Sequence, residues 1–145
     1  MIVEIKKTDN RAMLPKRATE GSAGYDLFAL LDEEVLIYPG APVRIHTGIS
    51  IAMPDSGMVG LVYPRSGLAS KFGLIPSNCV GVIDSDYRGE IMVSLTNLSR
   101  TAYALKPFER IAQLVFAPVL LPEFREVEAL DETDRGAGGF GSTGN

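Results

Sequence analysis

The residues with the clearest chemical potential lie at positions 81–91, where two aspartates, a tyrosine, an arginine and a glutamate fall close together. Apolar runs at 79–83 and 91–95 flank this cluster and are typical of strands. We therefore expect a β-hairpin with the charged residues at its tip. An acid and the ring of Tyr87 at the mouth of an apolar hairpin would hold a flat ring beside a base. A solvated turn is the alternative, since Asp, Ser and Gly are ordinary turn residues.

The second candidate region is the C-terminal stretch 135–144, in which five of ten residues are glycine. Such a segment cannot form core, and we expect a mobile arm. The stretch 136–141 matches G-x-G-x-x-G, but a dinucleotide motif needs a following helix and none follows before Asn145. Arg135 can bind phosphate, and Phe140 would cover a flat base. A lid over a nucleotide explains both residues, whereas a disordered tail explains only the glycines.

Composition restricts the class of protein. The chain has 145 residues, enough for one domain, which we place at 1–134, followed by the arm at 135–145. Its net charge is −4, and it has no dense Lys/Arg run. We therefore expect no binding to nucleic acid. We expect neither a signal peptide nor a membrane span, because the N-terminus and the apolar runs lack those patterns.

The single cysteine and the single histidine exclude two further classes. With only Cys79, the chain cannot form an internal disulfide, so a secreted disulfide scaffold is excluded. A reducing cytosol or nucleus is expected, and we predict a cytoplasmic location. Cys79 lies in an apolar run, and we expect it to be a buried small hydrophobe. With only His46, a cysteine–histidine metal cluster is also excluded; we interpret His46 as a strand residue.

Short apolar or alternating runs, separated by glycine and proline, indicate an all-β sandwich or barrel. The runs are 2–5, 35–38, 43–45, 49–53, 58–62, 80–83, 91–98, 102–105 and 111–119. The single helix that we expect is short, at 66–72, with Pro64 before it and Gly73 after it. Turn signals such as Pro39-Gly40 separate the strands.

Five segments, in order, resemble the five motifs of the trimeric dUTPase family. They are 23–29 (AGYDLFA), 64–69 (PRSGLA), 81–90 (GVIDSDYRGE), 109–116 (ERIAQLVF) and the glycine arm from Arg135. The resemblance implies a jelly-roll or distorted β-barrel subunit and a homotrimer with active sites at subunit contacts. It also implies Mg2+-assisted hydrolysis of dUTP to dUMP and pyrophosphate. That reaction would keep uracil out of DNA and supply dUMP for thymidylate synthesis.

The resemblance assigns catalytic roles to Asp84, Gln113 and Arg65. An ionised carboxylate can deprotonate a water, and the family pattern directs that water to the α-phosphorus. Asp84 and Asp86 would share a face of an extended chain, and the family motif selects Asp84. Gln113 lies in an apolar strand, where its amide needs a phosphate, a water or an interface partner.

Further residues are candidates for substrate binding. Tyr87 would pack under the deoxyribose and reject a 2′-hydroxyl, unless it is a surface strand residue. Met92 would pack beneath the base, unless it is core. Ser66 fits a phosphate contact at a helix start or a helix cap, or both. The complete set is Arg65, Ser66, Gly67, Asn78, Gly81, Val82, Ile83, Asp84, Tyr87, Met92, Gln113, Arg135, Phe140, Gly141, Ser142 and Thr143.

The expected metal is Mg2+ carried by the triphosphate, with no direct protein ligand. Mg2+ usually keeps several waters and takes phosphate oxygens. The resemblance implies that Asp26 supports the metal region through water. Three other functions stay open at this point: a dCTP deaminase of the same fold, a regulatory nucleotide-binding module without turnover, and a structural jelly-roll. The complete Asp84–Tyr87 motif and the arm argue against the deaminase. Nothing in the sequence demands the regulatory module, because every expected catalytic position is filled, and a structural jelly-roll would have no use for Arg135 and Phe140 in a glycine arm.

Overall fold

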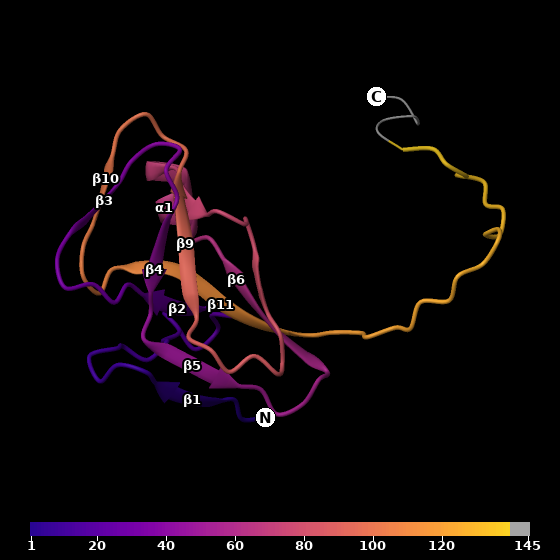
Figure 1. The fold of residues 1–145 in the computed structure, drawn as a ribbon, viewed down its shortest axis with the longest axis horizontal. Coiled ribbons are helices and arrows are strands. Elements are labelled where there is room, and N and C mark those ends of the chain that lie inside the picture. The colour runs from indigo at the N-terminus through magenta and orange to yellow at the C-terminus, as the bar shows by residue number, and fades with distance from the viewer. Residues whose placement is uncertain (140–145) are drawn as a thin grey trace.

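The computed structural model of the chain describes residues 1–139, and Figure 1 shows a body of strands with one short helix. The strands are β1 (Glu4–Lys7), β2 (Tyr25–Phe28), β3 (Val35–Ile37), β4 (Val43–His46), β5 (Ile49–Ala52), β6 (Met58–Tyr63), β7 (Leu74–Pro76), β8 (Gly81–Ile83), β9 (Met92–Asn97), β10 (Tyr103–Leu105) and β11 (Arg110–Pro118), and the helix is α1 (Ser66–Phe72). The expected all-β class with one short helix is confirmed.

The strands form small antiparallel sheets whose neighbours are far apart in sequence, which is the arrangement of a jelly-roll. One sheet has the order β2-β11-β6-β8 and another has the order β4-β9-β7. Two-stranded ladders pair β1 with β5 and β10 with β3. Because β11 pairs with both β2 and β6, it brings the first, second and fourth expected motif segments together.

The core lies between these sheets and follows from alternation along the strands. In β6 and β9, buried residues alternate with more exposed ones, as the period of two in a strand requires. Leu27, Leu95 and Leu114 are almost completely buried, and each contributes roughly 1.5–3 kcal/mol of transfer free energy. Packing of these side chains between the sheets therefore fixes the positions of the strands that carry the site.

The helix α1 begins and ends where the sequence predicted. Gly73 follows it in the left-handed conformation, with φ of 66°, and its N–H donates to the carbonyl of Ala69. This is a C-terminal cap that glycine adopts without strain. Arg65, with extended backbone, occupies the N-cap position, so Ser66 is the first helical residue. The interpretation of Ser66 as a cap is therefore wrong.

The predicted hairpin at 79–95 is also wrong. Strand β8 pairs with β6, whereas β9 pairs with β4 and β7. Residues 84–91 therefore cross from one sheet to another instead of closing a tight turn. Hydrophobic alternation shows which face of a strand is buried but not which strand lies beside it, so it could not reveal this crossing.

The segment before β8 gives a second correction. Cys79 is exposed, with φ of 62°, in a turn where its N–H donates to the carbonyl of Pro76. It is not the buried hydrophobe that its apolar neighbours suggested. The sequence also missed β2 and β7, because one carries Asp26 at its centre and the other is three residues long and ends in Pro76.

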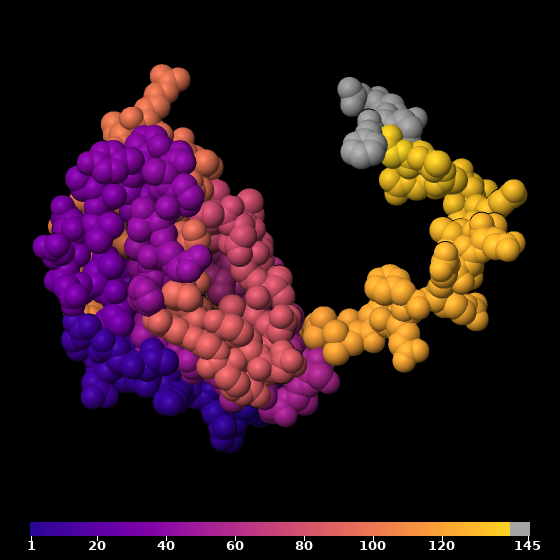
Figure 2. Space-filling view, in the orientation of Figure 1, coloured from indigo at the N-terminus to yellow at the C-terminus, as the bar shows by residue number. Residues whose placement is uncertain are grey.

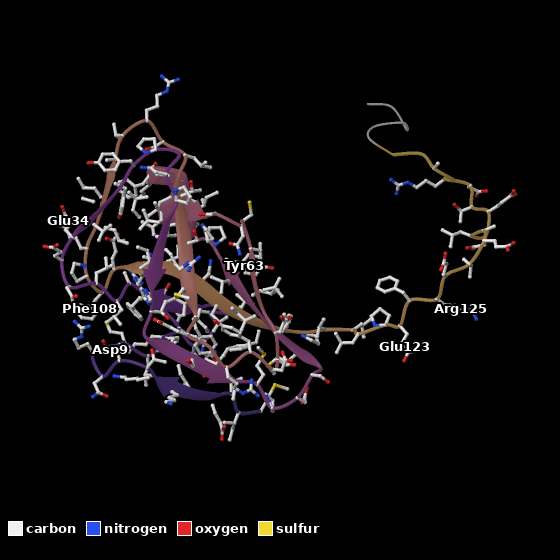
Figure 3. All side chains as sticks on the ribbon, viewed as in Figure 1. Asp9, Glu34, Tyr63, Phe108, Glu123 and Arg125 are labelled. Carbon is white, nitrogen blue, oxygen red and sulfur yellow. The ribbon has the colours of Figure 1, made fainter. Side chains whose placement is uncertain are left out.

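After β11 the chain leaves the body. The N–H of Val119 donates to the carbonyl of Gly57, and residues 120–139 then run outside the sheets (Figures 1 and 2). Glu123 and Arg125 lie on this extended segment, apart from the body (Figure 3). The division at residue 134 stays a prediction. Within residues 1–139 no helix is long and apolar enough to cross a membrane.

Candidate active site

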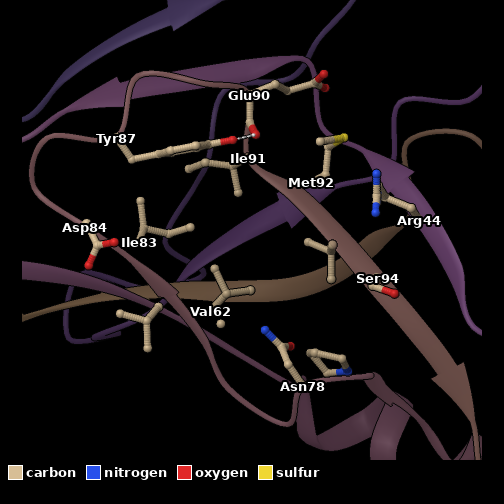
Figure 4. A pocket seen from close by; sticks show the side chains of 14 residues that line it. Arg44, Val62, Asn78, Ile83, Asp84, Tyr87, Glu90, Ile91, Met92 and Ser94 are labelled. Carbon is tan, nitrogen blue, oxygen red and sulfur yellow. Dashed lines mark hydrogen bonds between the residues drawn. The ribbon is translucent and has the colours of Figure 1, made fainter.

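A cavity of about 310 Å³ lies where β8 and β9 separate (Figure 4). It exists because the two strands belong to different sheets. The lining includes seven of the predicted site residues, namely Asn78, Gly81, Val82, Ile83, Asp84, Tyr87 and Met92. Arg44, Val62, Pro76, Glu90, Ile91, Val93 and Ser94 complete it. The charged cluster is therefore no isolated surface turn, since part of it lines a cavity.

The backbone of β8 forms one side of this cavity. Strand β8 is the edge of its sheet and pairs only with β6 along Gly81–Ile83. An edge strand presents a row of N–H and C=O groups on its other side. A Cβ at Gly81 would lie 3.2 Å from the Cβ of Val62, so glycine allows the chain to pass close to β6. The edge can therefore present backbone donors and acceptors to a flat polar ring.

The structure separates the two aspartates. Asp84 follows β8 directly and lines the cavity, whereas Asp86 lies outside its lining. Both residues are exposed. The N–H of Tyr87 donates to the carbonyl of Asp84 at 3.1 Å, so a turn links the acid and the ring. The geometry therefore favours Asp84 as the carboxylate that a ligand in this cavity would meet.

Tyr87, Met92 and Asn78 surround the cavity from different sides. The phenol of Tyr87 donates to the carbonyl of Glu90 at 2.9 Å. Met92 is 37% exposed and lines the cavity, so it is not a core residue. Asn78 lies at the end of the cavity away from Tyr87 (Figure 4). The walls therefore combine an aromatic ring, a thioether and an amide around an apolar floor.

A second cavity, of about 400 Å³, lies beside the start of α1. It contains Asp26, Arg65, Ser66, Gly67 and Gln113 from the predicted set. Strand β2 supplies Asp26, the start of α1 supplies Ser66 and Gly67, and β11 supplies Gln113. This cavity is polar and carries a guanidinium and helix N–H groups, which suit an anion such as phosphate.

Two arginines hold the carboxylate of Asp26 in the second cavity. The Nε of Arg65 donates to Oδ1 at 2.8 Å, and the Nη1 of Arg110 donates to Oδ2 at 3.1 Å. The side chain of Asp26 is 14% exposed, that of Arg65 25% and that of Arg110 49%. A partly buried carboxylate and guanidinium thereby neutralise one another, as buried charges must.

Gln113 is fixed in the same cavity. Its Nε2 donates to the carbonyl of Pro64 at 2.9 Å, which links β11 to the residue before Arg65. A Cβ on Gly24 would lie only 2.4 Å from the Oε1 of Gln113, so the amide packs directly on the glycine backbone. The expected contact with a phosphate or a water stays a prediction, and the bond to Pro64 sets the orientation of the amide.

The two cavities share no lining residue. Val62 lines the first and Tyr63 the second, and consecutive strand residues point to opposite faces of a sheet. One chain therefore does not bring Asp84 together with Arg65 and Gln113, which line two separate cavities.

Three cavity-lining residues, and Arg110 beside the second cavity, were not predicted from the sequence. Arg44 and Ser94 lie opposite one another on β4 and β9, and Glu90 ends the crossing segment. Arg110 precedes Gln113 and holds Asp26. Alternation in the run that contains Arg44 shows that it points out of the core, but no local pattern shows that it points toward a cavity. Glu90 is the last residue of the segment 81–90, but the sequence analysis gave it no role.

The expected arm is described only in part. The Nε of Arg135 donates to the carbonyl of Gly138 at 3.0 Å, within a turn of the extended segment. Arg135 therefore meets neither cavity of its own chain. The remaining arm residues, Phe140, Gly141, Ser142 and Thr143, lie outside the described residues.

Comparison with known proteins identifies the relatives of this chain. The dUTPase family model matches residues 10–144. The deoxyuridine 5′-triphosphate nucleotidohydrolase of Desulfitobacterium hafniense is 53% identical over 138 residues, covering 95% of this chain and 91% of the relative. The Acinetobacter baylyi enzyme of the same name is 50% identical over 148 residues, covering 99% of both chains.

The similar solved structures are also dUTPases. The dUTPase of Staphylococcus bacteriophage 80alpha with dUPNHPP has a TM-score of 0.87 and 29% identity, covering 99% of both chains. A dUTPase mutant of phage phi11 of S. aureus, described with a structural Mg(II) ion, has a TM-score of 0.79 and 26% identity, covering 89% of this chain and 98% of the other. The chain belongs to the dUTPase family, which confirms the resemblance of its five motifs and the enzyme class that they imply.

Proposed function

We propose that this protein hydrolyses dUTP to dUMP and pyrophosphate, with Asp84 as the base that activates water. One observation carries the proposal: a base-sized cavity is lined by the free edge of β8 and has Asp84 beside it. In the reaction, Asp84 takes a proton from a water molecule while the oxygen of that water attacks the α-phosphorus. The bond from the α-phosphorus to the bridging oxygen breaks, and pyrophosphate leaves in line.

Uracil binding is assigned to the first cavity. The alternating N–H and C=O groups at the edge of Gly81–Ile83 complement a ring that offers both a donor and acceptors. Cytosine reverses part of this pattern, so a fixed backbone edge discriminates against it. The amide of Asn78 adds a further polar contact, Met92 supports the base, and Tyr87 packs under the deoxyribose.

Phosphate binding is assigned to the second cavity. Arg65 offers donors beyond the one that holds Asp26, and Ser66 and Gly67 provide groups at the start of α1. Gln113 orients a phosphate oxygen or the attacking water. Both oxygens of Asp26 already accept from arginines, which fits contact with Mg2+ only through water. When bound, Mg2+ would supply neutralisation of the triphosphate charge.

A homotrimer would complete the site. Because Asp84 and the phosphate-binding residues lie on different faces of one subunit, an assembly that sets the first cavity of one copy against the second cavity of another brings them together. The extended segment 120–139 supports the same proposal, since it leads Arg135 away from its own body. In this assembly Phe140 covers the uracil, and Arg135, Gly141, Ser142 and Thr143 contact the outer phosphates.

The test is pyrophosphate release from dUTP with Mg2+, run beside UTP, dTTP and dCTP, for the wild type and Asp84→Asn. We expect turnover of dUTP alone and a loss of about 10²–10⁴-fold in Asp84→Asn, the range of general base catalysis. Asp86→Asn is the matched control, because Asp86 lies outside the cavity lining. Folded wild-type protein without turnover would refute the activity, and equal losses in both variants would refute the assignment of the base.

A further inference from the structure

Glu90 ends the crossing segment, and its carboxylate is bonded to the turn between β4 and β5. Oε1 accepts from the N–H of Gly48 at 2.7 Å and from the N–H of Thr47 at 3.2 Å. Oε2 lies 2.9 Å from Nδ1 of His46. One side chain thus joins the end of the charged segment to three consecutive residues of another strand pair.

The turn that receives this carboxylate is tightly packed. Gly48 has φ of 68°, and a Cβ there would lie 2.7 Å from the Cβ of Ala12. Thr47 is 2% exposed, and its hydroxyl donates to the carbonyl of Ile91, the residue after Glu90. The backbone of Glu90 is therefore fixed by its own carboxylate and by its neighbour.

The backbone of Glu90 in turn holds the ring of Tyr87. The carbonyl of Glu90 accepts from the phenol at 2.9 Å, while its carboxylate points away from the ring (Figure 4). The ring also packs on Gly89, where a Cβ would lie 2.4 Å from the phenol oxygen. The residues at 89 and 90 therefore define where the ring lies. Tyr87 is 41% exposed, so part of its side chain is free to contact a ligand.

We propose that Glu90 is a positioning residue for sugar selection, acting through Tyr87. The proposal rests on the proposed function, in which Tyr87 packs under the deoxyribose. The carboxylate fixes the Glu90 carbonyl, the carbonyl fixes the phenol, and the phenol fixes the ring that leaves no room for a 2′-hydroxyl. Glu90 touches no reacting atom. Its loss relaxes discrimination against UTP more than it slows hydrolysis of dUTP.

The experiment compares Glu90→Ala, Glu90→Gln and the wild type by kcat/KM for dUTP and for UTP. We expect Glu90→Ala to lower the dUTP-to-UTP ratio about 10-fold or more, within the range for loss of one steric or hydrogen-bonding discriminator. Glu90→Gln keeps an oxygen that accepts from Gly48 and Thr47, so its ratio stays within about 3-fold of the wild type. Glu34→Ala, which removes an exposed carboxylate before β3, is the matched control.

Two further variants separate positioning from general damage. Tyr87→Phe removes only the phenol bond, and its effect on the ratio should not add to that of Glu90→Ala, since both break one chain of contacts. Gly89→Ala displaces the ring of Tyr87 without changing the carboxylate of Glu90. It tests the position of the ring if Glu90→Ala does not fold. Equal losses for both nucleotides, or additive effects of the two variants, would overturn the proposal. A wild type inactive on dUTP would instead refute the proposed function.

Discussion

The two cavities of the chain differ in which groups provide their polar contacts. In the first, the free backbone edge of β8 lies beside polar side chains such as those of Asn78 and Asp84. In the second, the polar groups belong to charged side chains that bond to one another, with Asp26 between Arg65 and Arg110. A neutral base is recognised most selectively by hydrogen-bond donors and acceptors whose positions are fixed, such as those of a strand backbone. A charged ligand needs charges that stay neutralised until it arrives.

Among the changes that compare the two cavities, the largest expected effect belongs to Arg65 in the second cavity. Arg65→Ala removes the proposed phosphate donor and also leaves the 14% exposed Asp26 without its nearest partner. We expect kcat/KM for dUTP to fall about 10²–10³-fold, as for loss of one preorganised donor. Affinity for deoxyuridine, which lacks phosphate, should stay within about 2-fold of the wild-type value. Steady-state kinetics and calorimetry check the two parts.

Arg110→Ala is the comparison for this variant. Arg110 bonds to the same carboxylate, but its side chain is 49% exposed and it lies outside the lining of the second cavity. We expect a loss of about 10-fold or less, since exposed ion pairs contribute little. A weaker affinity for deoxyuridine in Arg65→Ala would show that the two cavities are not independent.

Gly24→Ala tests how closely the amide of Gln113 must be held. The new Cβ would lie 2.4 Å from Oε1 of Gln113, so the amide or β2 must move. A displacement of this kind costs about 10–100-fold in kcat, because catalytic geometry tolerates little error. Gly21→Ala is the control, because a Cβ at Gly21 has open space around it. Unchanged kcat in Gly24→Ala would show that Gln113 does not position a reacting group.

Met92→Ala tests the first cavity, and it should affect binding of the base but not of the phosphates, the opposite of Arg65→Ala. Removing the half-exposed thioether should weaken dUMP binding by about 1 kcal/mol, or roughly 5-fold, the scale for partial burial of an apolar side chain. Inhibition by pyrophosphate should be unchanged, because the second cavity is untouched. Competitive inhibition constants for dUMP and pyrophosphate measure both. Equal weakening of the two would mean that Met92 acts through the fold and not on the base.

The sequence predicted local features better than long-range ones. The helix at Ser66–Phe72 and its end at Gly73 follow from neighbours in the chain, and both were predicted correctly. The hairpin failed because the partners of β8 and β9 lie elsewhere in the sequence. The predicted burial of Cys79 was wrong because a turn between apolar residues has the same sequence pattern as a strand.

The site shows the same limit. The motifs identified Asp84, Arg65 and Gln113, but only the fold shows that they line two cavities on different faces of one chain. Glu90 and Arg110 were missed as functional candidates because their bonds run to residues more than forty positions away. Contacts of that length leave no local pattern in the sequence. Their roles become visible once distances are known.

The smallest expected effect concerns the pH dependence of the bonds that fix Glu90. Burial by itself raises the pKa of Glu90, but the hydrogen bonds from His46 and from the N–H of Gly48 outweigh it and lower the pKa. A lowered pKa means that the carboxylate stabilises the fold fully above its unfolded pKa near 4.5 and loses this contribution as the pH falls below that value.

The variant Glu90→Gln has no carboxylate at this position and therefore lacks that titration. The wild type should therefore be more stable than the variant at pH 7, and the gap in Tm should narrow between pH 5 and pH 3. Asp9, whose pKa is lowered to about 2 chiefly by the side-chain hydrogen bond from Arg11, titrates in both proteins and cancels in the difference. A gap that stays constant on acidification would show that the charge of Glu90 does not hold the turn, and that neutral hydrogen bonding there is sufficient to fix Tyr87.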